Sequence, residues 1–310
     1  MRNEAVAAEI ADRNTPIAGT LFGIAYRMLG SVHDAEDAVQ DTLERWLRLT
    51  PESRSEIETP PAWLRTVLTR RCLDLLDSAP RRREHYRGVW LPEPLWPDAS
   101  CAPSAAPAAA DDPAALVAQR ETVTLAVLCA MEALSPVERV SFVLHEAFGV
   151  PFPEIAAAVD RTPASCRQAA TSARARLRET RELSRDPAGH EAAVAAFSAA
   201  CATGDLDQLI QLLDPSVVAR ADGGRLVQAA LRPVHGAERV AHYLLGVIRV
   251  QAGRRAPMEF RMGQVNGRLG ILVREAGAVV CVVDVAAGAR GIRQIALQVN
   301  PEKLGVASAS

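Results

Sequence analysis

The sequence predicts a multidomain chain with two all-α helical bundles followed by a C-terminal α+β module. Helical periodicity dominates before residue 79 and again between residues 114 and 179. The segment from Ala99 to Ala115 separates these stretches, and its nine Ala and three Pro among seventeen residues are typical of a linker. After Asp186 and Pro187 the pattern changes to strand-like runs. The 310 residues are enough for two or three domains, each with its own core.

The first bundle contains TLFGIAYRML (residues 20–29) and then DAEDAVQDTLERWL (residues 34–47). The second stretch follows Ser31, a residue type favoured as a helix N-cap. Successive residues of a helix are rotated by about 100°. One side of this helix then carries Ala35, Val39, Thr42, Leu43 and Trp46, and we expect it to lie in the core. The other side carries Asp34, Asp37, Asp41 and Glu44, and we expect it to face water or a basic partner.

This acidic stripe has three interpretations. A metal site of the helical-bundle kind requires a Glu-x-x-His pair, which the sequence lacks. A docking surface would use the carboxylates to bind a basic partner protein. A solvated face is the third interpretation, with Asp41 and Glu44 paired to Arg45 and Arg48 of the same helix. Taken alone, the stripe favours the solvated face.

A third helix is predicted at PPAWLRTVLTRRCLDLLDS (residues 60–78), with two prolines at its start. Trp63 can stack on a nucleic-acid base or pack in the core. We favour the core because Leu64, Val67 and Leu68 continue its apolar side.

The second bundle includes a helix capped by Ser135 with Pro136 at its first position. A short helix around Ile155 then leads to a turn at Asp160 and Arg161, and Thr162 and Pro163 open a second, Arg-rich helix. Two short helices joined by a tight turn form a helix-turn-helix. We expect its second helix to pack through Cys166, Ala169, Ala170 and Leu177. A buried thiol is commoner than a redox sensor, so we interpret Cys166 as a packing residue.

The C-terminal module begins with helical patterns at residues 190–213 and 237–250. Four strand-like runs follow: APMEFRMGQV, RLGILVRE, AVVCVVDVAA and IRQIALQV. Asn266-Gly267 and then Gly277 separate the first three runs, and such residues are typical of hairpin turns. Helices followed by an antiparallel sheet predict an α+β fold.

Charge and cysteine content exclude several classes of protein. The 35 basic and 37 acidic residues give a net charge of −2, yet residues 65–87 hold seven Arg against three acids, and residues 161–185 hold seven against two. Two basic blocks in an acidic half predict two phosphate-facing surfaces. The six Cys form no C-x-x-C, so no metal site, disulfide framework or cofactor is expected. The N-terminus has no apolar signal core and no run is long enough to span a bilayer, so we expect a cytoplasmic protein that binds no membrane.

Three blocks, in order, resemble the sigma-70 family of bacterial RNA polymerase sigma factors, in particular the extracytoplasmic-function type. They are LFGIAYRMLGSVHDAEDAVQDTLERWLR, AWLRTVLTRRCLDLLDSAPRRRE and LSPVERVSFVLHEAFGVPFPEIAAAVDRTPASCRQAATSARARLRE. The resemblance covers about residues 16–180. It implies a sigma region 2 domain at residues 1–88, a linker at 89–115 that includes WLPEP, and a sigma region 4 helix-turn-helix domain at 116–185.

The resemblance assigns roles to the charged residues of both bundles. Asp34, Asp37 and Asp41 would dock on the coiled coil of the largest subunit of core RNA polymerase. The downstream element of promoter DNA would be bound by Arg65, Arg70, Arg71, Arg81, Arg82 and Arg83. Many relatives have Asn where this chain has Arg70, so its base preference stays open. At the upstream element, contacts to bases or nearby phosphates would come from Ser165, Arg167, Gln168 and Thr171, and phosphate contacts from Arg174 and Arg176.

The third module has its own resemblance. WLPEPLW (residues 90–96), ADGGRL (221–226) and NPEKL (300–304) are similar to motifs of sigma factors that carry a fused SnoaL-like domain. The resemblance covers about residues 188–305 and implies the cone-shaped nuclear transport factor 2 fold, a regulatory role and a small-molecule ligand. The contact residues between modules would be Trp90, Leu91, Pro92, Asp222, Asn300, Pro301, Lys303 and Leu304.

The leading hypothesis is a sigma factor, not an enzyme, that brings RNA polymerase to promoters and is modulated by its third module. A SnoaL-like ligand-binding or cyclase-type enzyme with DNA-binding helical modules is the alternative. Its acid and base could come only from Asp222, His235, His242 and Asp284, whose spacing defines no pair. A helix-turn-helix repressor is a third hypothesis, disfavoured because repressors usually work as symmetric dimers with one reader per subunit.

Overall fold

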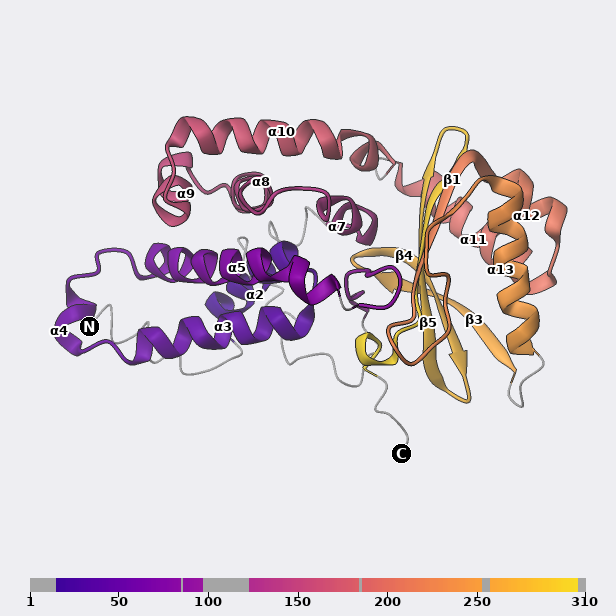
Figure 1. Cartoon of the computed structure of the whole chain (residues 1–310), viewed down its shortest axis with the longest axis horizontal. Coiled ribbons are helices and arrows are strands. Elements are labelled where there is room, and N and C mark those ends of the chain that lie inside the picture. The colour runs from indigo at the N-terminus through magenta and orange to yellow at the C-terminus, as the bar shows by residue number, and fades with distance from the viewer. Residues whose placement is uncertain (1–14, 85, 97–122, 184–185, 253–256, 306–310) are drawn as a thin grey trace. The chain divides into compact units, whose positions relative to one another are not determined.

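The computed structural model describes residues 15–84, 86–96, 123–183, 186–252 and 257–305, and for residues 80–84 and 251–252 it describes the backbone alone. The chain divides into two compact units. The helical unit contains the described residues up to 82 and those from 131 to 176. The sheet unit contains residues 83–96, 123–130 and those from 177 onward. Figure 1 shows the elements of both units, which are described separately below.

The first part of the helical unit consists of α2 (Pro16–Leu29), α3 (Val32–Leu47), α4 (Pro51–Ser55) and α5 (Pro60–Glu84). Ser31 caps α3 by accepting a hydrogen bond from the Asp34 backbone N–H, as the sequence predicts. The predicted apolar side of α3 is buried, and the ring of Trp46 packs edge-on against Trp63 at 5.4 Å. Trp63 is half-buried against the fully buried Trp46, and this contact favours the core interpretation.

The second part of the helical unit consists of α8 (Pro136–Phe142), the π-helical turn η1 (Val143–Ala147), α9 (Phe152–Val159) and α10 (Pro163–Glu182). Ser135 and Glu138 form a reciprocal capping box at the start of α8. Asp160 ends α9 in the left-handed conformation, with φ of 52°, and α10 begins three residues later. The predicted helix-turn-helix is thus confirmed.

The sheet unit contains α7 (Leu125–Met131) except for its last residue, together with α11 (Pro187–Thr203), α12 (Leu206–Leu212) and α13 (Ala237–Ala252). Its strands are β1 (Leu213–Asp222), β2 (Val234–His235), β3 (Met258–Val265), β4 (Arg268–Glu275), β5 (Ala278–Gly288) and β6 (Gly291–Gln298). They form one sheet in the order β2-β1-β6-β5-β4-β3. The last helical turns of α10, from Leu177, also belong to this unit.

The sheet is mixed, so the expectation of a purely antiparallel sheet is wrong. The four predicted strands do form an antiparallel meander from β3 to β6. β1 was not predicted from the sequence, and this strand pairs in parallel with β6. A parallel pair requires a long crossover, and here α13 and four strands, β2 to β5, lie between the two partners along the chain.

The two faces of this sheet are covered by different segments. Figure 1 shows α11, α12 and α13 together on one face. There, Phe197, Leu244 and Ile295 belong to the main core cluster of the unit. On the opposite face, Trp96 packs with Val265, Leu272, Val282 and Leu304. The WLPEPLW segment is therefore packed onto the C-terminal module instead of extending as a solvated tether.

No helix within the described ranges is long and apolar enough to cross a membrane.

Candidate functional site

The acidic stripe lies along one side of α3, within the helical unit. Asp37 is exposed and lies 3.6 Å from His33, and Asp34 and Asp41 are half-buried. Asp41 pairs with Arg71 of α5 at 2.8 Å, and not with Arg45 of its own helix. Glu44 does pair with Arg48 on the same helix. Asp37 is thus an exposed carboxylate of the stripe, whereas Asp41 is paired with Arg71. Both features are compatible with docking of a basic partner.

Two of the arginines expected at the downstream promoter element contact α9 of the helix-turn-helix. Arg65 forms an ion pair with Glu154 at 3.0 Å. Arg70 donates hydrogen bonds to the carbonyl oxygens of Ala157 and Ala158, at the end of α9 where carbonyls lack helical partners. Binding of DNA by these two arginines requires that they leave α9. Arg81, Arg82 and Arg83 lie in the last turns of α5, outside the described side chains.

The second helix of the helix-turn-helix exposes the predicted reading residues: Ser165, Arg167, Gln168 and Thr171. Cys166 and Ala170 face inward and are buried, as predicted. Burial also raises the pKa of the Cys166 thiol, which favours its protonated form. The Arg167 guanidinium lies over the ring of Phe152 at 5.3 Å.

The two expected phosphate ligands of this helix already have carboxylate partners. Arg174 pairs with Glu146, and Arg176 lies 3.4 Å from Glu138. The hydrogen bond to Glu146 raises the pKa of Arg174, so the guanidinium stays charged. Phosphates of a nucleic acid would replace these carboxylates.

Arg139 is a structural residue that the sequence analysis missed. Its side chain is buried in α8 and donates to the carbonyl oxygens of Met28 (2.9 Å) and Met131 (2.6 Å) and to the Glu132 carboxylate (2.9 Å). Burial lowers the pKa of Arg139 to about 10. Because Met28 belongs to α2, this arginine joins the two helical regions through buried hydrogen bonds.

The sheet unit contains a buried polar site centred on Asp222, the last residue of β1. Its side chain is fully buried and accepts hydrogen bonds from the Leu91 backbone N–H (2.9 Å) and the Tyr86 hydroxyl (2.5 Å). Lys303 donates to the same carboxylate at 2.8 Å and to the Leu91 carbonyl oxygen at 2.5 Å. The site thus joins residues of all three motifs, and we call this group of contacts around Asp222 the clasp.

Further contacts hold the WLPEPLW segment in the clasp. The ammonium group of Lys303 lies over the ring of Trp90 at 4.2 Å. Leu95 and Asn266 exchange two hydrogen bonds, of 2.8 and 3.0 Å. Asn300 donates to the Tyr86 hydroxyl at 3.1 Å. Burial, followed by the bond to Asp222, raises the pKa of Tyr86, so the phenol remains a hydrogen-bond donor.

Gly224 explains part of the ADGGRL motif. Its φ is +59°, and its backbone N–H donates to Asp222 at 3.0 Å. A Cβ atom here would lie 2.6 Å from the side-chain nitrogen of Asn300. Asp222, Lys303 and Asn300 were predicted from the sequence as contact residues, whereas Gly224 and Tyr86 were not. The two consecutive glycines after Asp222 could have indicated the role of Gly224. Tyr86 lies outside all three motifs, so no motif indicated its role.

The four acid-base candidates do not form a catalytic pair. Asp222 belongs to the clasp, and Asp284 is buried beside Arg268 at 3.4 Å. His235 and His242 are both exposed, on β2 and α13. The described residues contain no group of His, Cys, Asp and Glu that could hold a metal ion. These four residues therefore do not combine into a general acid-base site.

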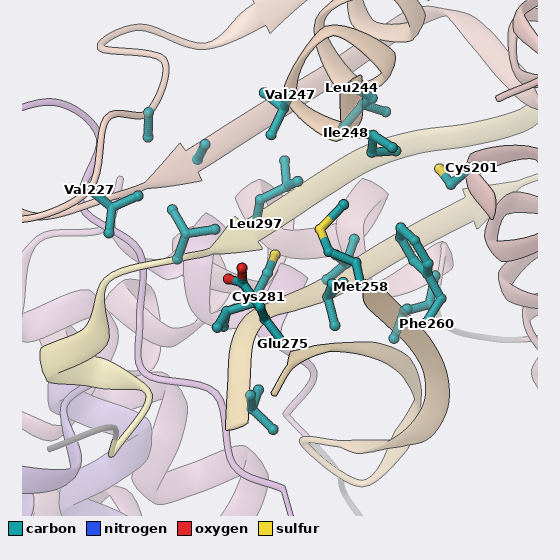
Figure 2. Close-up of a pocket in the computed structure, with 18 of the residues that line it drawn as sticks. Cys201, Val227, Leu244, Val247, Ile248, Met258, Phe260, Glu275, Cys281 and Leu297 are labelled. Carbon is teal, nitrogen blue, oxygen red and sulfur yellow. The ribbon is translucent and has the colours of Figure 1, made fainter. Parts of the chain in front are cut away.

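A separate cavity of about 230 Å³ lies between the sheet and its helices (Figure 2). Its lining includes Phe260 and Ile271 of the sheet, and Leu244 and Ile248 of α13. None of the four acid-base candidates lines it.

A helix-turn-helix whose second helix exposes polar and basic side chains is typical of DNA-binding transcription factors. Family models agree: the model of sigma-70 region 2 matches residues 17–82, and the model of sigma-70 region 4 matches residues 124–177.

The chain is 39% identical over 255 residues to the ECF RNA polymerase sigma factor SigJ of Mycobacterium tuberculosis, covering 81% of this chain and 76% of that protein. It is 38% identical over 226 residues to the probable ECF RNA polymerase sigma factor SigI of the same species, covering 73% and 72%. The crystal structure of Mycobacterium tuberculosis SigJ is similar with a TM-score of 0.70 and 31% identity, covering 95% of this chain and 98% of that one.

The chain belongs to the extracytoplasmic-function (ECF) sigma factors of the sigma-70 family. It is therefore a non-enzymatic transcription initiation factor that directs RNA polymerase to promoters.

Proposed function

We propose that this sigma factor recruits core RNA polymerase under the control of its own C-terminal module, and that the clasp is the regulatory contact. The observation that carries the proposal is the burial of Asp222 against both the WLPEPLW and the NPEKL segments. A buried carboxylate is costly unless hydrogen-bonded and paired, and here the paired ammonium group and most of the hydrogen-bond donors come from residues outside the sheet. The clasp therefore favours one position of the chain just after region 2.

The clasp acts on the DNA-binding helices through chain connectivity. α5 ends at Glu84, and Tyr86 of the clasp follows two residues later. At the other region, Glu179 at the end of α10 pairs with Arg293 of β6, and Thr180 lies within hydrogen-bond distance of Gln294. The chain that follows α5 and the end of α10 thus both belong to the sheet unit. We infer that it limits the spacing between promoter elements that regions 2 and 4 can bind together.

The remaining residue roles belong to the same proposal. The exposed side of α3, with Asp34, Asp37 and Asp41, docks on the coiled coil of the largest polymerase subunit. The downstream element is bound by Arg65, Arg70, Arg71, Arg81, Arg82 and Arg83. The upstream element is bound by Ser165, Arg167, Gln168, Thr171, Arg174 and Arg176. We place the region 2 domain at residues 1–88, the region 4 domain at 116–185 and the C-terminal module at 188–305. We also propose that the protein acts in the cytoplasm.

We also assign the C-terminal module to the SnoaL-like class with the nuclear transport factor 2 fold. Its three motifs support this assignment, as does a sheet covered on one face by three helices. The mixed six-stranded sheet is compatible with that fold.

Transcription with purified core polymerase tests the regulatory proposal. Asp222→Asn replaces a carboxylate oxygen by an amide group that faces the donors Lys303 and Leu91. We expect promoter-directed transcription to change at least threefold at equal protein concentration. Asp207→Asn, an exposed position on α12 of the same module, is the matched control and should behave like the unaltered protein. Equal transcription by all three proteins would rule out a regulatory role for the clasp.

A further inference from the structure

The cavity beneath α13 is open to solvent and has an apolar entrance. Val247, on its rim, is 39% exposed although it is a large apolar residue. Met258, Phe260, Val279 and Val280 also line the cavity and are only partly buried. Apolar side chains lining an open, concave space are the usual surroundings of a small-molecule ligand.

Small side chains create the space. Cys201, Ala221, Ala229 and Cys281 all line the cavity, and larger residues at these positions would fill it. Protein interiors are otherwise close-packed, with few voids larger than a water molecule. A dry apolar cavity of about 150 Å³ can hold benzene. The cavity of about 230 Å³ found here therefore has room for about ten non-hydrogen atoms.

The strand register places one carboxylate in this apolar wall. Phe260 pairs with Val273 and Val273 with Cys281, so the three side chains lie in one row on the helix-covered face. Glu275 lies two residues beyond Val273 on β4 and therefore shares that face. Figure 2 shows its carboxylate among the side chains that line the cavity.

Glu275 has no partner among the described residues: its carboxylate makes no hydrogen bond or ion pair with any of them. It is half-buried, and it is the one acidic residue within the described part of the cavity wall. The other ionisable groups there are neutral. Burial raises the pKa of the Cys201 and Cys281 thiols to about 12 and also raises the pKa of Tyr243. The wall thus combines an apolar surface with a single negative charge and no reactive thiolate.

We propose that this cavity binds a small, largely apolar amine of about ten non-hydrogen atoms, with its ammonium group at Glu275 and its hydrocarbon part against Phe260, Ile271 and Leu244. A cationic group supplies the hydrogen bonds that the carboxylate lacks, and the hydrocarbon part removes the apolar wall from water.

The same cavity wall includes parts of the clasp. Pro301 and Leu304 line the cavity on either side of Lys303, and Ala221 precedes Asp222. Leu304 also packs against Trp96 of the WLPEPLW segment. A ligand in contact with Pro301 and Leu304 holds the NPEKL segment in place, so it stabilises the closed clasp. This second step rests on the proposed regulatory function, whereas binding itself does not.

Calorimetric titration of the full-length protein with 2-phenylethylamine tests binding, with ethylbenzene as the uncharged probe of the same shape. We expect the amine to bind and Glu275→Gln to weaken it at least tenfold, while ethylbenzene binding changes less than twofold. Glu259→Gln is the matched control because Glu259 is an exposed acid on the opposite face of the neighbouring strand. Equal amine affinities in Glu275→Gln and the unaltered protein would overturn the assigned ligand class.

A second variant tests the cavity itself. Val247→Trp adds bulk at the exposed rim without disturbing buried residues, and we expect it to weaken binding of both probes at least tenfold. Unfolding curves establish that the variant is folded. Failure of both probes to bind the unaltered protein at millimolar concentration would exclude the site.

Transcription separates the two proposals. If the ligand stabilises the closed clasp, 2-phenylethylamine should shift transcription by the unaltered protein and leave Glu275→Gln unaffected. If the amine binds without affecting transcription while Asp222→Asn does change it, the coupling is wrong and the regulatory clasp stands. If Asp222→Asn has no effect either, the regulatory function fails whatever the cavity binds.

Discussion

Charged side chains join distant segments in both units, but the two sets of contacts differ in exposure. In the helical unit, the side chains of Arg65 and Glu154 are 29% and 45% exposed. In the sheet unit, those of Lys303 and Asp222 are 8% and 0% exposed. The first pair connects regions 2 and 4, and the second connects the WLPEPLW segment with the C-terminal module.

The difference in exposure predicts which contact opens first. An exposed ion pair contributes about 0–1 kcal/mol and is screened by salt. Breaking a buried pair by removing one partner costs about 3–5 kcal/mol, because the other charge is left buried and uncompensated. If Arg65 binds DNA as we propose, phosphates should replace its contact with Glu154 easily, whereas the clasp should persist until something compensates both of its charges.

Arg139 shows that the helical unit also contains one buried charge. Its hydrogen bonds to Met28 and Met131 need only backbone carbonyls as partners. Among the described residues, buried Arg139 and the more exposed pair of Arg65 and Glu154 both join regions 2 and 4.

The largest expected effect on stability follows from breaking the buried pair of Asp222 and Lys303. Asp222→Ala should lower the free energy of unfolding of the sheet unit by about 3–5 kcal/mol, because Lys303 is left without its carboxylate. Chemical denaturation of the full-length protein measures this change, with Asp207→Ala as the control. A loss below about 1 kcal/mol would mean that the clasp is no stronger than an exposed ion pair.

Two glycine substitutions compare a crowded position in the clasp with an open position on α13 of the same module. Gly224→Ala should destabilise the protein by about 2 kcal/mol, since its positive φ and the nearby Asn300 leave no room for Cβ. Gly246→Ala lies in α13 with open space around it and should stabilise by up to about 1 kcal/mol. Thermal unfolding gives both values. Two changes of the same sign would contradict the clasp geometry.

Replacing Asp34, Asp37 and Asp41 together by Ala should weaken binding to core polymerase about tenfold, or about 1.4 kcal/mol. Surface substitutions typically change stability by under about 0.5 kcal/mol each, so the fold should persist. Asp74→Ala with Asp77→Ala removes exposed acids from α5 and is the control. Equal polymerase affinity in a pull-down would exclude docking through α3.

The smallest effect concerns the exposed pair. Glu154→Ala should change stability by less than about 1 kcal/mol and increase affinity for single-stranded downstream DNA about twofold by releasing Arg65. Fluorescence anisotropy at two salt concentrations measures the affinity. A loss of more than about 2 kcal/mol of stability would mean that the pair of Arg65 and Glu154 behaves like the buried pair in the clasp.

Structural features that depend on only a few adjacent residues were predictable from the sequence. Ser31 and Ser135 cap helices because their hydroxyls reach N–H groups three residues away. Asn266 and Gly267 form the turn between β3 and β4, with φ of 48° and 76°. Such signals need no information about distant parts of the chain.

Features that depend on distant partners were not predictable from the sequence. β1 pairs with β6 across about seventy residues, and nothing local in SVVARAD marks it as a strand in parallel pairing. Tyr86 reaches Asp222 only because the chain folds back, and Arg139 is buried although its helix is short and partly polar. In each case tertiary contacts outweigh local preference.

The most direct test of the regulatory clasp is transcription from a promoter library in which the spacing between the two elements is varied. With the clasp closed, the unaltered protein should initiate within a narrow range of spacings. Asp222→Asn should broaden that range, because the chain after α5 is no longer held on the sheet unit. Identical spacing profiles for the two proteins would contradict the claim that the C-terminal module controls promoter recognition through the clasp.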